Sequence, residues 1–101
     1  NYHVLFNRGK VNLLRGNELI AKGYFTELLK KDSSNFAVYK DMASISVDES
    51  NNDLTVYYLE KANSLQPTNA DVASELSGFY IEAKKYEQAE KLLKTAIQAD
   101  Q

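Results

Sequence analysis

Residues 70–99 read ADVASELSGFYIEAKKYEQAEKLLKTAIQA, and this stretch decides the fold class. Its apolar side chains recur in two separate runs at the spacing of one helix face. The first run comprises Val72, Leu76, Phe79, Tyr80 and Ala83, and the second comprises Tyr86, Ala89, Leu92, Leu93, Ala96 and Ile97. Lys84-Lys85 interrupts the apolar face between them. The stretch therefore predicts two consecutive amphipathic helices joined by a short turn.

The same pattern returns when the sequence is shifted against itself so that Gly9 aligns with Ala43, a shift that we call one repeat. Small residues align in one column, which contains Gly9, Ala43 and Ser77. Bulky apolar residues align in another, which contains Phe25, Leu59 and Leu93. A small residue is wanted where two helix backbones approach closely, and a large one fills the groove opposite. We therefore expect three helical hairpins, covering residues 2–35, 36–69 and 70–101.

Turn residues separate the helices. Ser50-Asn51-Asn52-Asp53 predicts a turn followed by an N-cap, and Gly16-Asn17 predicts the inner turn of the first hairpin. Pro67 ends the second hairpin. One proline and four glycines leave few other breakers. The sequence thus predicts a single all-α domain of six helices, each of roughly 10–14 residues.

The spacing of Gly9, Ala21, Phe25 and Leu28 resembles the consensus of the tetratricopeptide repeat (TPR) family. The later repeats show corresponding residues, namely Ala43, Leu59, Ala62 and Pro67, and then Leu76, Tyr80, Tyr86, Ala89 and Ala96. Three repeats in unbroken register extend the resemblance over essentially the whole chain. It implies a right-handed α-solenoid of three antiparallel hairpins that binds a protein or peptide and is not an enzyme. Arg8 departs from the pattern, since an apolar residue is usual there.

The resemblance also implies where a ligand would bind. The first helices of TPR repeats line a concave groove, and the residues expected to face it here are Phe6, Asn7, Lys10, Lys40, Asp41, Ser44, Asp48, Asp71, Glu75 and Glu82. Two acidic columns recur in consecutive repeats, Asp41 with Glu75 and Asp48 with Glu82. We therefore expect a partner with a basic segment. Asp41 and Glu75 replace the Asn and the basic residue of TPR domains that grip chaperone C-termini, so we do not expect that ligand.

Other classes of function find little support in the sequence. A net charge of −2 lacks the basic balance of nucleic-acid-binding domains. The single histidine, His3, cannot form a metal or catalytic site alone, and there is no cysteine or glycine-rich phosphate loop. No apolar run approaches the roughly 18 residues of a membrane span. We expect no metal, no cofactor, no catalysis and no membrane insertion, while the cellular compartment is not fixed by these features.

The two ends of the chain differ in charge and raise a second hypothesis. Residues 2–35 carry six basic and three acidic residues, whereas residues 70–101 carry four and six. Terminal repeats of solenoids need a cap because repeats bury their apolar faces against neighbours. We expect some of Tyr80, Leu92, Leu93 and Ile97 to face outward and to be covered by a further helix or a second copy. The alternative function is thus a self-associating scaffold, and the start at Asn1 suggests part of a longer chain.

Overall fold

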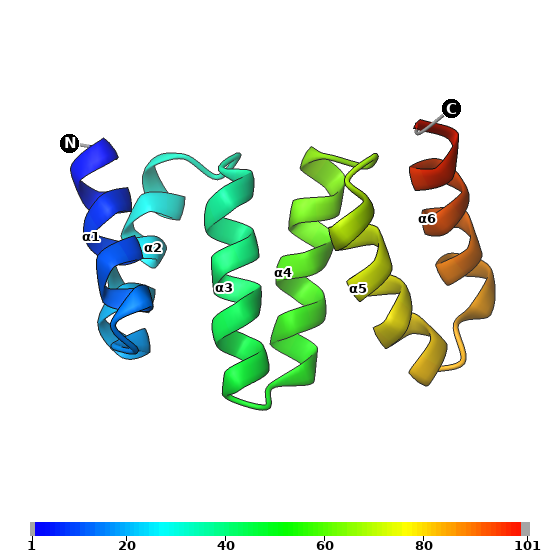
Figure 1. The fold of residues 1–101 in the computed structure, drawn as a ribbon, viewed down its shortest axis with the longest axis horizontal. Coiled ribbons are helices and arrows are strands. Elements are labelled where there is room, and N and C mark those ends of the chain that lie inside the picture. Colours follow the sequence, from blue (N-terminus) through cyan, green and yellow to red (C-terminus); the bar gives the residue numbers. More distant parts are fainter. Residues whose placement is uncertain (1, 100–101) are drawn as a thin grey trace.

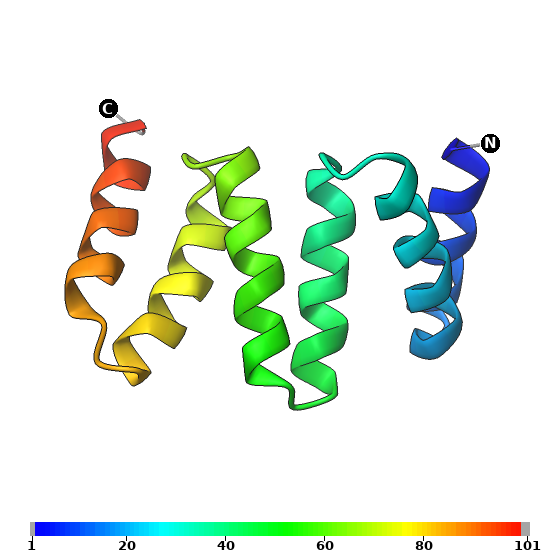
Figure 2. The same cartoon turned by 180° about the vertical axis from the view of Figure 1, so that it is seen from behind.

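The computed structural model describes residues 2–99, with side chains placed for residues 2–98. Within that range the chain forms six α-helices and no strand. The helices are α1 (Tyr2–Leu14), α2 (Glu18–Lys31), α3 (Phe36–Asp48), α4 (Asn52–Leu65), α5 (Ala70–Glu82) and α6 (Tyr86–Ala99). They pack as three antiparallel hairpins in a row, with the chain ends at opposite ends of the row (Figures 1 and 2). The predicted all-α architecture of six helices is confirmed.

The first two hairpins are held at the crossing predicted from the small and large columns. In the first, a Cβ added at Gly9 would lie 2.6 Å from Cε1 of Phe25, so the α1 backbone rests directly on the aromatic ring. Phe25 is fully buried. In the second hairpin Ala43 and Leu59 occupy the same two columns, and both are buried. Where the small residue is glycine its partner is phenylalanine, and where it is alanine its partner is the smaller leucine, so the pair fills the crossing in both hairpins.

The inner turn of every hairpin contains one residue with positive φ, at the equivalent position of each repeat. The three residues are Gly16 (φ 82°), Ser50 (φ 57°) and Lys84 (φ 63°). The following N–H donates back across the helix end, as in Asn17 N to Asn12 O at 2.8 Å. This is the Schellman ending of a helix, in which the left-handed residue is usually glycine. Only the first repeat has glycine there.

Asparagine side chains start three of the helices. The Oδ1 atoms of Asn35, Asn51 and Asn69 accept hydrogen bonds from the backbone N–H three residues later, at 3.2, 3.1 and 3.1 Å. Such caps satisfy one of the free N–H groups at a helix start. The N-cap predicted from the Ser50–Asp53 cluster is therefore confirmed at Asn51. Asn35 and Asn69 occupy equivalent positions one repeat apart, so this cap belongs to the repeat.

Two apolar clusters form the core, and each bridges consecutive hairpins. One joins α2 to α3 through Ala21, Phe25, Leu28, Val38, Met42 and Ile45. The other joins the second hairpin to α5 and α6 through Tyr39, Ala43, Leu59, Ala62, Val72, Leu76, Tyr80 and Ala89. Leu29 and Tyr58 pack against both. The core is therefore continuous along the row, as stacked repeats require.

The outward-facing residues expected in the third repeat divide between core and surface. Tyr80 is buried, because it belongs to the apolar cluster that joins the second hairpin to α5 and α6. Leu92 is half-buried and packs against the same core, and Leu93 is also half-buried. Ile97 is exposed. Of that set, Tyr80 therefore belongs to the core, and Ile97 is the large apolar side chain that faces solvent.

Candidate binding groove

A cavity of about 390 Å³ opens between α3, the start of the second hairpin, and α5. Five of the residues expected to face a groove line it, namely Lys40, Asp41, Ser44, Asp48 and Glu75. They come together because α3 and α5 are first helices of consecutive repeats, and residues one repeat apart therefore point to the same side. Asp41 and Glu75 are such a pair. The cavity presents three carboxylates and one ammonium group.

Apolar side chains form part of the cavity wall, and these were not among the predicted site residues. Val47 of α3 and Leu59 of α4 both line it. Val47 is 51% exposed, and Ile81, its counterpart one repeat later on α5, is 49% exposed. Val47 and Ile81 thus form an apolar column on first helices, a sequence signal that lies outside the charged columns. The cavity can therefore take up aliphatic surface as well as charge.

Lys10 reaches the cavity from the neighbouring repeat and changes its electrostatics. Its Nζ lies 2.9 Å from both carboxylate oxygens of Asp41, which links α1 to α3. The Asp41 side chain is only 14% exposed. A carboxylate that is mostly buried needs such a partner. The charge of Asp41 is thus already balanced within the chain, and Glu75 and Asp48 carry the remaining negative charge of the cavity.

The other predicted groove residues lie elsewhere. Phe6 is half-buried and packs against Phe25, with ring centroids 6.3 Å apart. Asn7 lines a different cavity on the outer face of the first hairpin. Asp71 and Glu82 are exposed on α5 and do not line the cavity between α3 and α5. The structure therefore gathers the predicted residues of the second repeat and Glu75 into one cavity, with Lys10 at Asp41, and leaves the others outside it.

Two further charged contacts surround the groove. The Lys40 ammonium lies 5.9 Å from the Phe36 ring centroid, a cation–π contact on its own helix. At the end of α3, the pKa of the Glu18 carboxyl is raised. The largest cause is a side-chain hydrogen bond with Asp48, followed by desolvation and by the negative charges of Asp48 and Glu49. Like charges close together favour the protonated form of a carboxyl group. Glu18 and Asp48 thus place two neighbouring carboxyl groups at the end of α3.

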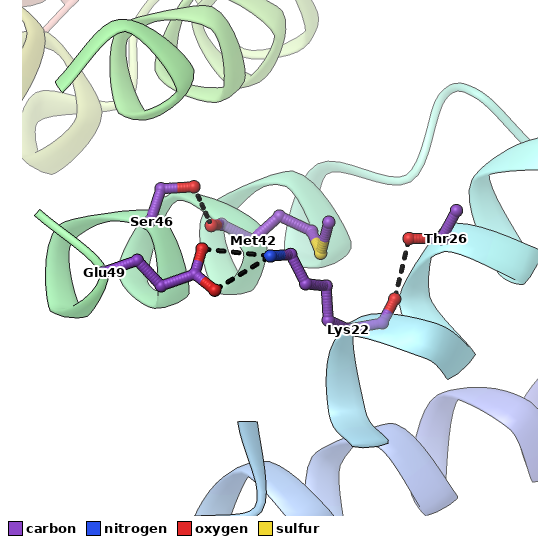
Figure 3. A network of polar contacts seen from close by, with 5 residues as sticks. All are labelled: Lys22, Thr26, Met42, Ser46 and Glu49. Carbon is purple, nitrogen blue, oxygen red and sulfur yellow. Dashed lines mark hydrogen bonds and ion pairs between the residues drawn. The ribbon is translucent and has the colours of Figure 1, made fainter. Parts of the chain in front are cut away.

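The first and second hairpins are fastened by an ion pair at their junction. Lys22 Nζ on α2 lies 2.9 Å from Oε2 of Glu49, at the end of α3 (Figure 3). On the same helices Thr26 donates to the Lys22 carbonyl at 2.7 Å and Ser46 to the Met42 carbonyl at 3.0 Å. The hydroxyls of Thr26 and Ser46 are satisfied within their own helices. Lys22 with Glu49, like Lys10 with Asp41, therefore joins the first hairpin to the second by an ion pair.

Comparison with known proteins places the chain in a family. A family described as Tetratricopeptide repeat matches residues 46–101, more than half of the sequence. The chain belongs to the tetratricopeptide repeat family. A solved structure described as "MamA MSR-1 C2" matches with a TM-score of 0.75 at 18% sequence identity, over 99% of this chain and 57% of that one. At that identity the likeness concerns the fold, and it agrees with a TPR solenoid.

No curated protein sequence matches this chain. None of the helices in residues 2–99 is both long enough and apolar enough to cross a membrane. In the same part of the chain, no three His, Cys, Asp or Glu side chains are arranged to hold a metal ion. Membership of the TPR family supports a protein-interaction scaffold in general terms, since its members are generally non-enzymatic scaffolds.

Proposed function

We propose that this domain is a non-enzymatic scaffold that binds a peptide segment carrying Lys or Arg in the cavity between α3 and α5. The observation that carries the proposal is the convergence of Asp41, Asp48 and Glu75 around a wall that includes Val47 and Leu59. Exposed carboxylates attract a basic side chain, and the apolar wall accepts its aliphatic stem. The proposal includes no cofactor and no nucleic acid.

The ion pair between Lys10 and Asp41 decides how the three acids contribute. Because Lys10 already neutralises Asp41, an incoming ammonium or guanidinium group interacts mainly with Glu75 and Asp48. Removing Lys10 would expose the Asp41 carboxylate to the ligand. The proposal therefore makes two opposite predictions, weaker binding when Glu75 loses its charge and stronger binding when Lys10 loses its charge.

Short fluorescent peptides provide the probe, with two Lys residues among apolar residues in one set and two Glu residues in the matched set. Anisotropy should show binding of the basic set, decreasing with added salt because exposed charges are screened. The double change Asp41→Asn, Glu75→Gln should weaken binding about 2- to 10-fold, consistent with exposed charge pairs. Lys10→Gln should strengthen it.

Asp71→Asn is the matched control, because it removes one exposed acid of α5 that lies outside the cavity. Its affinity for basic peptides should stay near that of the parent chain. Tighter binding of the acidic peptides would contradict the proposed ligand. Equal affinity of the parent and the Asp41→Asn, Glu75→Gln chain would show that this cavity is not the site.

Self-association is a second candidate function, favoured by one specific observation. Large apolar side chains are exposed at both ends of the row of hairpins, Val11 and Ile20 at the first and Ile97 at the last. Exposed apolar patches on a folded domain commonly mark contact surfaces. This function does not involve the groove, so either one can hold without the other.

A further inference from the structure

Consecutive hairpins meet at two junctions inside the molecule, where the first helix of one hairpin packs on the hairpin before it. The residues that α3 uses at such a junction have exposed counterparts on α1. At the internal junctions, Val38 and Ile45 of α3 are 0% and 1% exposed against α2. Val4 and Val11 are their counterparts one repeat earlier and are 53% and 47% exposed. They line an open cavity of about 620 Å³ with Asn7, Arg8, Asn12, Arg15, Ile20 and Tyr24. α1 therefore presents the face that α3 uses to pack on a preceding helix.

The residues that the second helix of a hairpin uses to pack on the next hairpin have partly exposed counterparts on α6. Phe25 and Leu59, which pack at internal junctions, are 0% and 1% exposed, whereas Leu93 in the same column is only half-buried. Ile97 is 58% exposed. Leu29, two repeats earlier, is half-buried and packs against both core clusters. α6 therefore presents the face that α2 and α4 use to pack on a following helix.

Charge at one pair of positions indicates which helix fits the α1 face. Inside the molecule Lys22 of α2 pairs with Glu49 at 2.9 Å. Arg15 is the counterpart of Glu49 one repeat earlier, and Glu90 is the counterpart of Lys22 two repeats later. If α6 packed on α1 in the same register, Glu90 would face Arg15, which is the same contact with the charges exchanged. Glu90 pairs otherwise with Lys94 at 3.2 Å, an exposed pair within one helix that contributes little.

We propose that the α1 face binds α6 of a second copy of this chain, in the register that continues the repeat. This inference rests on the second candidate function above and supplies its surface and partner. The first repeat is net positive and the third net negative, which also favours head-to-tail association. Such an interface is heterologous, so it produces open chains of copies rather than a closed dimer.

Arg8 explains why copies would associate more weakly than hairpins within one chain. It occupies the column of Met42 and Leu76, which are buried at the internal junctions. Its guanidinium lies 5.5 Å from the Tyr24 ring centroid, so the charged group rests on an aromatic face beside the cavity. An internal junction has an apolar side chain at this position. We therefore expect association that depends on concentration rather than a permanent assembly.

Two end-blocked variants test the interface. Val11→Glu places a charge on the α1 face, and Ile97→Glu places one on the α6 face. Both positions are exposed, so the fold should survive, which circular dichroism checks. By sedimentation velocity the parent chain should form a concentration-dependent series, and each variant alone should be monomeric. An equimolar mixture should form a one-to-one dimer, since each variant keeps one working face.

Several outcomes of that experiment overturn the proposal. A parent chain that stays monomeric at high concentration leaves the α1 face to another occupant. A variant that still assembles alone, or a mixture that stays monomeric, shows that the ends do not bind each other. Assembly lost in the groove variant Glu75→Gln, but kept in both end-blocked variants, assigns self-association to the groove. Peptide binding in the groove is measured separately, so a failure of the α1–α6 interface can be distinguished from a failure of the proposed peptide site.

Charge exchange tests the register. Arg15→Glu and Glu90→Arg should each weaken association about 2- to 5-fold, as expected for an exposed ion pair, and the double variant should recover it. Glu87→Arg changes the net charge equally. Leu19 of α2, the counterpart of Glu87, is 82% exposed although α2 packs on α3. The Glu87→Arg variant should therefore affect association little beyond the effect of net charge. A double variant weaker than either single change would contradict this register.

Discussion

The first and third hairpins use the same crossing with different side chains and different tightness. Gly9 lies against the fully buried ring of Phe25, whereas Ser77 is buried in the same column and Leu93, the counterpart of Phe25, is half-buried. Phe25 also packs against residues of α3, the first helix of the following repeat. The repeat register therefore fixes where the small residue lies, and the neighbouring repeat determines how tightly the crossing is packed.

Replacing the alanine shared by the first and third hairpins with a larger residue should test both the repeat register and how tightly each hairpin is packed. Ala21 in the first hairpin is 0% exposed and Ala89 in the third is 3% exposed. Ala21→Leu should lower the free energy of unfolding by about 3 kcal/mol and Ala89→Leu by about 1 kcal/mol, within the usual range for overpacking. The smaller loss reflects Leu93, which can move toward solvent.

Thermal unfolding measures the difference, since about 1 kcal/mol shifts the midpoint by roughly 4–8 °C in a domain of this size. Replacing the exposed Ala37 of α3 by Leu is the matched control and should change little. An Ala89→Leu chain as stable as the parent would contradict the register. Equal losses at Ala21 and Ala89 would show that the third hairpin is packed as tightly as the first.

Much of this arrangement could be predicted from the sequence, because it depends on residue size at a fixed period. The columns of Gly9 and Phe25 indicate a close helix crossing, and Asn51 indicates a cap. Side-chain contacts across repeats could not be predicted in the same way. The ion pair of Lys10 with Asp41 joins two columns, and its formation depends on side-chain rotamers that a periodic pattern does not encode.

Two other features could not be predicted from the sequence, for physical reasons. The left-handed turn position is marked only in the first repeat, because Ser50 and Lys84 give no sign of a positive φ. The surrounding helix ends impose that conformation against its usual steric cost. In the candidate groove, Val47 was missed because apolar residues on a helix are first assigned to the core, and its 51% exposure follows only from the packing of the helices.

Replacing glycine by alanine should have opposite effects on stability in the first and third hairpins. Gly9→Ala should destabilise the chain by about 1–2 kcal/mol, because the new Cβ overlaps a ring that the core prevents from moving. Gly78→Ala on α5 should stabilise it by about 0.5–1 kcal/mol, because no atom lies within 4 Å of its added Cβ and alanine is the better helix former. Urea unfolding measures both changes. A Gly9→Ala chain that is as stable as the parent, or more stable, would show that the close approach of α1 to Phe25 is wrong.

The third hairpin is also tethered by a hydrogen bond that the first hairpin does not use. Tyr80 of α5 donates its hydroxyl to Oε2 of Glu60 on α4 at 2.5 Å. Tyr80→Phe should cost about 1 kcal/mol at neutral pH, the usual net value of such a bond. Burial, followed by the hydrogen bond to Glu60 and its negative charge, raises the pKa of Tyr80 to about 12. In the unfolded chain tyrosine ionises near pH 10.

Between these values the folded chain keeps a proton that the unfolded chain loses, so the contribution of Tyr80 to stability is complete below about pH 10 and is lost as the pH rises toward 12. The parent chain should therefore be more stable than Tyr80→Phe at pH 7, and this advantage should shrink above pH 10. Urea unfolding of both chains across that range measures it, and the difference between them removes the effect of other groups that titrate there. Glu60→Gln keeps an acceptor without the charge and should reduce the pH dependence. A stability difference that stays constant from pH 7 to pH 11 would mean that Tyr80 titrates alike in both states and that its contact with Glu60 does not hold α5 to α4.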